Sequence, residues 1–459
     1  MTYQSNTKRK LSIINNQLSI KKALLTIALV LACATITAQT VTYAIEAGTG
    51  TTFTCTAAGA TNQSLANVLA AIRTSANGAA CTIQFGSGGT NVLNVGTNTV
   101  EFSGSGWGAI TLTGRLSGSN PYLIDLNDGV SINSTAVITN TLNSGSPYTI
   151  RNRGSGTVTI SDGEVSPTSG RAIGNYSTGA IEISGGTVKA MINNASTGTV
   201  TISGGTVSST SGNNGTISNT AGTVNISGGT VSAAGAQGVA IITSSGLVTI
   251  SNNAIVTSAN TTATSGTVYL QAGGTGTRLS VRQSGANFPT VSNTATGGNA
   301  IYNASVGRVE FNVPSGQSTF GGRIAGSSGV DGAGRVWKTG TGTLTLTANN
   351  TYPGTTHIAQ GTLVLGSGGS IENSFVMMDA STTLDVSAGN KKIKGFAPDY
   401  TNQGGINLGL STLTIGTQGL ADGGGAFAPL FLCHDDQGDI FKHSGFCRIR
   451  CGSCACTAP

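Results

Sequence analysis

A short unit of β-branched residues and glycine recurs five times between Ile150 and Ile255, and it limits the possible folds more than any other feature of the chain. Its most regular copies read Thr-Val-Thr-Ile-Ser-Gly-Gly-Thr-Val from Thr199 and Thr-Val-Asn-Ile-Ser-Gly-Gly-Thr-Val from Thr223. A repeat of this length indicates stacked coils. Because the unit has no helical pattern, each coil must consist of strands joined by tight turns. The equivalent isoleucines, separated by 23, 19, 24 and 24 residues, are Ile160, Ile183, Ile202, Ile226 and Ile250.

Three apolar anchors in each unit predict three short strands per coil. A valine or isoleucine stands two residues before each central isoleucine, and strand geometry turns both side chains to the same inward face. The glycine pairs between anchors supply corners that need positive φ. The first anchors, nine or ten residues upstream, are Ile150, Ile173, Ile192, Ile217 and Ile241, and the third, five residues downstream, are Val165, Val188, Val207, Val231 and Ile255.

A column of asparagines accompanies the first anchors. Asn152, Asn175, Asn194 and Asn219 each follow a first anchor by two residues, and Thr243 interrupts the column in the fifth unit. This spacing predicts inward side chains, whose amides can bond to one another from coil to coil. The alternative is that asparagine stands there simply as a common turn residue. Another coil is predicted around Ile301, Asn303 and Phe311.

The N-terminus has the pattern of an export signal. Basic residues from Lys8 to Lys22 precede an apolar run from Ala23 to Ala32, which is too short to span a membrane. We therefore expect a signal peptide over residues 1–38, cleaved after Ala38, with the lipobox-like Cys33 as a rival site. Residues 1–38 hold five of the basic residues and no acids, so a formal charge of +6 becomes 6 − 5 = +1. This gives a nucleic-acid partner no electrostatic support.

Residues 39–91 are expected to form an N-terminal cap. Leu65, Val68, Leu69 and Ile72 are spaced as one helix face, with Ser64 as the candidate N-cap. Such a helix would cover the open end of the core and its unpaired strand edge. Cys55 and Cys81 are a plausible disulfide pair in an exported chain.

The repeats over residues 92–325 resemble the right-handed parallel β-helix of pectate-lyase-like proteins and autotransporter passengers. Residues 326–430 contain a second pattern, Lys338-Thr-Gly-Thr-Gly-Thr-Leu344, then Asn350-Thr-Tyr352 and Gly361-Thr-Leu363. This pattern resembles the autotransporter-associated β-strand repeat, also called the passenger-associated transport repeat. The resemblance implies a secreted β-helix passenger whose repeat is associated with export. No barrel pattern follows, so we expect either separate export machinery or a lost anchoring domain.

The Cys-rich tail over residues 431–459 differs from the rest of the chain. It holds five cysteines and two histidines and lacks the Gly-Thr repeats, so it is expected to be disordered or aberrant. Cys451 and Cys454, with His434 and His443, suggest a zinc site as an alternative. A shifted reading frame near residue 430 is a further hypothesis.

The sequence offers no catalytic, cofactor or metal-binding residues that we would assign. Its acids, Asp125 and Asp128 among them, do not recur at the coil period and are expected at solvated turns, and His357 has no evident Ser or Asp partner. The chain is therefore expected to be a structural or adhesin-like rod at the cell surface, without enzymatic activity. Its expected partners are host or matrix glycans or proteins, with a carbohydrate-active lyase or hydrolase as the alternative function.

Overall fold

A computed structural model describes the chain over the following residues: 35–36, 39–48, 50–57, 65–86, 89–210, 212, 214–272, 277–328, 333–397, 403–416, 433–434 and 440–441. The strands up to residue 57 and beyond residue 432 are described by their backbone alone. The predicted cleavage site after Ala38 and most of the Cys-rich tail lie outside the described residues.

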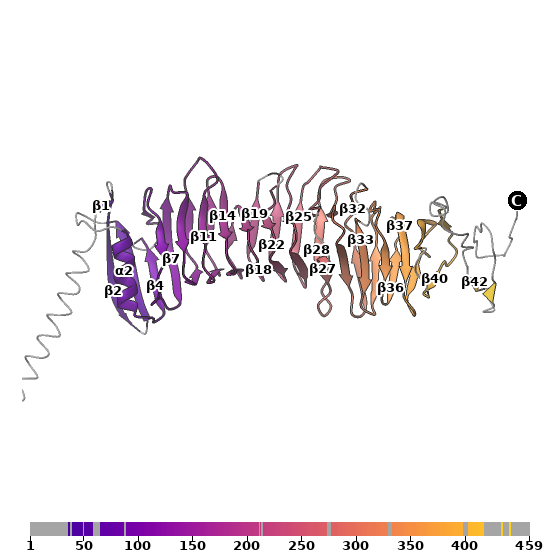
Figure 1. The fold of residues 1–459 in the computed structure, drawn as a ribbon, viewed down its shortest axis with the longest axis horizontal. Coiled ribbons are helices and arrows are strands. Elements are labelled where there is room, and N and C mark those ends of the chain that lie inside the picture. Colours follow the sequence, from indigo (N-terminus) through magenta and orange to yellow (C-terminus); the bar gives the residue numbers. More distant parts are fainter. Residues whose placement is uncertain are drawn as a thin grey trace, which may run out of the picture. The chain divides into compact units, whose positions relative to one another are not determined.

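The fold is a parallel β-solenoid, which confirms the predicted class. Almost every element is a strand, and the described residues contain a single helix. The chain divides into two compact units, residues 1–193 and 194–459, with the boundary inside strand β17 (Met191–Asn194). Within each unit, strands from successive coils lie side by side (Figure 1).

Unit 1 begins with an antiparallel hairpin and the predicted helix. Strand β2 (Gln39–Gly48) pairs with β1 (Thr35–Ile36) and with β3 (Gly50–Ala57). Helix α2 (Leu65–Ala76) buries the apolar face that its spacing predicted, whereas Ser64 lies outside the described residues. The helix ends where Asn77 and Gly78 adopt positive φ, a conformation that glycine and asparagine accept most readily.

The predicted Cys55–Cys81 bridge is not formed. Cys81 is a free, buried thiol in β4 (Cys81–Phe85). The parallel register of β3 and β4 pairs Cys55 with Phe85 and Cys81 with Thr51. An offset of four residues corresponds to about 13 Å along a strand, well beyond the Cα separation that a disulfide spans.

Unit 1 has three parallel ladders, and β7 (Ile110–Gly118) contributes to two of them because the chain turns at Gly114. Ladder I comprises β3, β4, β7, β9 (Ile132–Ser134), β12 (Thr157–Ile160) and β15 (Ala180–Ile183). Ladder II comprises β5 (Leu93–Asn94), β7, β10 (Val137–Asn140), β13 (Glu164–Pro167) and β16 (Thr187–Val188). Ladder III comprises β6 (Val100–Phe102), β8 (Tyr122–Leu126), β11 (Tyr148–Asn152) and β14 (Arg171–Asn175).

Unit 2 has four parallel ladders. Ladder IV comprises β18 (Thr199–Ile202), β21 (Thr223–Ile226), β24 (Leu247–Ser251), β27 (Thr277–Arg282), β30 (Arg308–Asn312), β33 (Arg335–Thr339), β35 (Thr356–Ile358), β37 (Ile371–Met378), β39 (Lys391–Phe396) and β41 (Leu413–Ile415). Ladder V comprises β19 (Thr206–Ser209), β22 (Thr230–Ala233), β25 (Ile255–Ser258) and β28 (Thr290–Asn293). Ladder VI comprises β20 (Ile217–Asn219), β23 (Ile241–Thr243), β26 (Val268–Leu270), β29 (Ile301–Asn303) and β32 (Ile324–Gly326). Ladder VII comprises β31 (Gln317–Phe320), β34 (Thr343–Leu346), β36 (Thr362–Leu365), β38 (Thr383–Asp385) and β40 (Gly405–Asn407). Strands β42 (Cys433–His434) and β43 (Ile440–Phe441) form a separate antiparallel pair.

The predicted inward columns form the core of each unit. In unit 1, Ile160 pairs in register with Ile183. In unit 2, Ile226 pairs with both Ile202 and Ile250. All five isoleucines are buried, as expected when each coil covers the aliphatic side chains of its neighbour.

One predicted anchor was wrong. Val256, and not Ile255, pairs with Val231 and is buried, whereas Ile255 is 42% exposed. The turn after Ile250 is one residue longer than the Ser-Gly-Gly turn of the preceding coil, and Asn252 adopts positive φ within it. One added residue reverses the inward and outward sides of a strand, so the pattern resumes one position later.

The coils that contain the second sequence pattern have two strands each rather than three. From β33 onward, strands of ladder IV alternate along the chain with strands of ladder VII. The third side is formed by irregular chain around Tyr352, whose ring is buried and whose hydroxyl lies 2.8 Å from Thr356 Oγ1. A large side chain therefore fills interior space that small aliphatic residues occupy in earlier coils.

The asparagine column is buried at the end of the ladder III and ladder VI strands. In unit 1, Asn152 Nδ2 donates to Gly156 O at 2.8 Å and to Asn175 Oδ1 at 3.3 Å. In unit 2, Asn194 Nδ2 donates to Asn219 Oδ1 at 2.8 Å. Asn152, Asn194 and Asn219 thus donate both to the turn of their own coil and to the next side chain along the column, which satisfies these polar groups without water.

Candidate functional site

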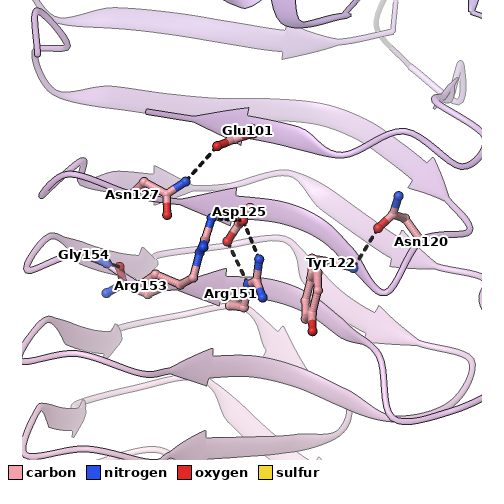
Figure 2. A network of polar contacts seen from close by, with 9 residues as sticks. Glu101, Asn120, Tyr122, Asp125, Asn127, Arg151, Arg153 and Gly154 are labelled. Carbon is pink, nitrogen blue, oxygen red and sulfur yellow. Dashed lines mark hydrogen bonds and ion pairs between the residues drawn. The ribbon is translucent and has the colours of Figure 1, made fainter. Parts of the chain in front are cut away.

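The outward side of ladder III in unit 1 carries a cluster of aromatic and charged side chains. We call it the tyrosine–arginine face, and Figure 2 shows the part of it around Asp125. Tyr148 pairs in register with Tyr122 on one side and with Arg171 on the other, so the rings and cations of successive coils lie next to each other. The face comprises Tyr122, Asp125, Tyr148, Arg151, Arg153, Arg171, Tyr176 and Asn193.

Asp125 is the anchor of this face. Its Oδ1 and Oδ2 atoms accept hydrogen bonds of 2.9 and 2.7 Å from Arg151, and Oδ2 also accepts one of 2.9 Å from Arg153 (Figure 2). The Arg151 guanidinium lies 3.3 Å from the centre of the Tyr122 ring. The hydrogen bond to Asp125 raises the pKa of Arg151, so this guanidinium stays charged. Bidentate geometry and ring stacking fix this arginine in one orientation.

Tyr148 occupies the centre of the face. Its ring meets the Tyr176 ring edge-on at 5.6 Å, and its hydroxyl accepts hydrogen bonds from the Tyr176 hydroxyl at 2.7 Å and from Asn193 Nδ2 at 2.9 Å. Burial, followed by the bond from Tyr176, raises the pKa of Tyr148 to about 12. The ring is only 3% exposed, so it supports its neighbours and is not itself a contact surface.

A glycine makes room for this arrangement. A Cβ atom at Gly174 would lie 2.6 Å from Tyr148 Cε1 and 3.1 Å from Tyr176 Cε2. Real Cβ atoms do not approach other carbons as closely as 2.6 Å, so a side chain at Gly174 would push the Tyr148 ring away from the strand and crowd the Tyr176 ring. Gly174 faces outward in β14, opposite Arg151 in the neighbouring strand.

The expectation that Asp125 lies at a solvated turn was wrong, because Asp125 is 4% exposed and sits within β8. The signal was present in the sequence. Asp125 precedes Arg151 by 26 residues, and Tyr122 precedes Tyr148 by the same 26. That shared spacing is the length of this coil, which is longer than the repeats on which the period was measured.

A second cluster lies on the outward side of ladder IV in unit 2. His357 Nε2 lies 2.8 Å from Asp379 Oδ1, and the His357 ring meets the Trp337 ring edge-on at 4.5 Å. The Arg308 guanidinium covers Trp337 at 4.1 Å from the ring centre. The expectation that His357 has no Ser or Asp partner was therefore wrong, since Asp379 comes from the next coil, 22 residues away.

Lys338 is buried at a corner next to this cluster. Its Nζ donates to three backbone carbonyl oxygens, those of Thr339 at 3.0 Å, Gly340 at 2.6 Å and Gln360 at 3.0 Å. Burial lowers the pKa of Lys338 to about 8. The ammonium group links the end of β33 to the chain that follows β35 in the next coil, so its role is structural.

A shallow groove of about 540 Å³ lies over β37, β39 and β41 in unit 2. Glu372, Lys392 and Lys394 line it together with hydroxyl and amide side chains. The described residues contain no group of three or more His, Cys, Asp or Glu side chains that could hold a metal ion. The single helix of the described residues, α2, is not long and apolar enough to cross a membrane.

Residues 338–365 match the model of the passenger-associated-transport-repeat family. The matched segment begins at Lys338 and spans most of two coils, from β33 to β36. No curated protein and no solved structure matches the chain. Together with the parallel solenoid, the family match makes the chain similar to an autotransporter passenger β-helix, and it suggests an extracellular or cell-surface protein.

Proposed function

We propose that this protein is a secreted or cell-surface β-helix with a structural or adhesin-like role. The observation that carries the proposal is the transport-repeat match at residues 338–365 within a parallel solenoid. In that segment, the buried side chains of Lys338 and Tyr352 form hydrogen bonds inside the coil. The repeat can therefore be understood as a structural part of the solenoid.

The composition of the outer positions supports this role. The 88 residues between Lys189 and Arg278 contain no charged side chain. Their outward positions carry mainly threonine, serine and asparagine, for example Thr201 and Asn225 in ladder IV. A surface of this kind lacks the charge repulsion that keeps many soluble proteins apart, and it suits contact with other surfaces.

The export route is part of the proposal. Residues 1–38 would direct the chain across the inner membrane and be removed after Ala38, and the mature chain would then be carried to the surface. The expected partners are host or matrix glycans or proteins. The basic-then-apolar pattern at the N-terminus and the transport repeat support this route.

The proposal is tested by locating the full chain on the cells that produce it. Antibodies raised against residues 92–325 should label intact cells, and added protease should remove the label while a periplasmic marker protein stays intact. Mass spectrometry of the labelled protein should find Gln39 at its N-terminus. Labelling only after lysis, with an uncleaved N-terminus, would show that the protein is not a surface passenger.

A second assay separates a structural role from an enzymatic one. Purified protein is incubated with a panel of acidic and neutral polysaccharides, and unsaturated and reducing ends are measured. A structural β-helix releases neither above the level of a heat-denatured sample. Sustained release from any member of the panel would replace the structural role with a lyase or hydrolase activity.

A further inference from the structure

The tyrosine–arginine face of unit 1 combines tyrosine rings with arginine side chains on neighbouring coils. It gathers three of the nine tyrosines of the chain on three successive coils. Every cation within it is an arginine, and the sequence contains no lysine between Lys22 and Lys189. Tyrosine and arginine are enriched where proteins bind other proteins, whereas lysine is depleted there.

The face has a rigid base and accessible edges. Asp125 and Tyr148 are buried and hold their neighbours through the bonds described above. Tyr176 is 46% exposed, and the Arg153 side chain is 47% exposed. Both accessible groups are already held in place by hydrogen bonds, so a partner would lose little side-chain entropy in contacting them.

The charge balance of the face is positive. Arg151, Arg153 and Arg171 contribute three positive charges and Asp125 one negative charge, so the sum is 3 − 1 = +2. Glu101 pairs in register with Asp125 at one edge of the face, where Asn127 donates to its Oε1 at 2.9 Å, and it lowers the sum to 3 − 2 = +1 (Figure 2). A complementary surface therefore needs carboxylates near Arg153 and Arg171 and an apolar or aromatic group over Tyr176.

We propose that the tyrosine–arginine face is a docking site for a protein partner with an acidic contact surface. Arg153 and Arg171 would pair with carboxylates of the partner, and the exposed Tyr176 ring would carry the apolar contact. The inference rests on the proposed surface function, under which the exported chain presents this face to proteins outside the cell.

A peptide selection tests the inference with a defined probe. A random dodecapeptide library displayed on phage is panned against the purified full chain, and bound peptides are synthesised and titrated by calorimetry. We expect selected peptides to carry Asp and Glu well above their frequency in the library. Arg153→Ser and Tyr176→Ser should each weaken binding at least tenfold, whereas Tyr176→Phe, which keeps the ring, should not.

Lys189→Ser is the matched control. Lys189 is also a half-exposed cation of unit 1, but it pairs with Glu164 on ladder II, away from the face. Its substitution should leave peptide binding unchanged. Thermal melting of each variant shows whether it remains folded, and if Tyr176→Ser unfolds, Arg153→Ser carries the test.

Three outcomes would overturn the inference: selected peptides without acidic enrichment, affinities equal in the wild type and the Arg153→Ser variant, or tighter binding to polygalacturonate than to any peptide. Because the titration uses purified protein, these results are independent of cell-surface labelling. A protein that is labelled on cells but binds no acidic peptide would keep the proposed function and lose the docking site.

Discussion

Replacing Asn219 by alanine removes one member of the buried asparagine column in unit 2. Asn219 Nδ2 donates to Gly222 O at 2.8 Å and to Thr243 Oγ1 at 3.3 Å, and its Oδ1 accepts from Asn194 at 2.8 Å. The substitution leaves a buried carbonyl and a buried amide without these partners. Asn194 Nδ2 keeps its 2.7 Å hydrogen bond to Gly198 O, so its lost bond counts at the lower end of the about 1–3 kcal/mol for each such group. The free energy of unfolding should therefore fall by roughly 2–4 kcal/mol.

The chain provides a matched control and an internal comparison. Asn225 lies on the outward side of β21, only partly buried, so Asn225→Ala deletes the same atoms at a wet position and should cost less than about 0.5 kcal/mol. Asn219→Thr copies Thr243, the residue that continues the column, whose hydroxyl donates to Gly246 O at 3.3 Å. It should fall between the other two variants.

Urea unfolding, monitored by far-ultraviolet circular dichroism, measures these differences in the free energy of unfolding. They appear as shifts of the transition midpoint when the dependence of that free energy on urea concentration is the same in all variants. The expected order of stability is wild type and Asn225→Ala, then Asn219→Thr, then Asn219→Ala. Equal midpoints for Asn219→Ala and Asn225→Ala would refute the reasoning, because the column would then contribute nothing beyond an ordinary turn residue.

Three further predictions concern the tyrosine–arginine face, a corner glycine and the free thiol. The raised pKa of Tyr148 stabilises the folded state below pH 10, and this stability, roughly 2–3 kcal/mol, is lost as the pH rises from 10 through 12. The unfolding midpoint of Tyr148→Phe should therefore not fall over this pH range as that of the wild type does. An identical fall in both proteins would contradict the prediction. Gly229→Ala should destabilise the protein by about 1–3 kcal/mol, because φ is +67° and a Cβ would lie 2.5 Å from Gly204 O, whereas Gly235→Ala has no positive φ and should be nearly neutral in the same urea assay. Cys81, whose pKa burial raises to about 11, should be alkylated by iodoacetamide only after unfolding, and a peptide linking it to Cys55 in non-reducing mass spectrometry would contradict the register of β3 and β4.

The coil architecture could be predicted because it follows from local spacing. A separation of two residues between Ile217 and Asn219 was enough to place both side chains toward the interior, since strands have a fixed period. The same rule failed at Ile255, because a turn can gain a residue without leaving a mark on the strands beside it.

The tyrosine–arginine face was harder to predict because it depends on register between coils. Asp125 and Arg151 meet only because their coil contains 26 residues, and no local pattern states which coil length applies. The pairing of His357 with Asp379 has the same origin. The prediction of a disulfide between Cys55 and Cys81 failed for a related reason, because the two residues lie in adjacent strands but four positions out of register.

A distance measurement between remote coils of unit 2 tests the stacking most directly. Thr201 and Glu310 are 109 residues apart in sequence but only four strand steps apart in ladder IV, which corresponds to about 19 Å between their backbones. Spin labels attached at these two positions through an unnatural keto amino acid avoid the eight native cysteines. Double electron–electron resonance should give one narrow distribution centred within about 20–25 Å once label length is added to the strand spacing. A broad distribution extending beyond about 35 Å would mean that the coils do not stack in this register.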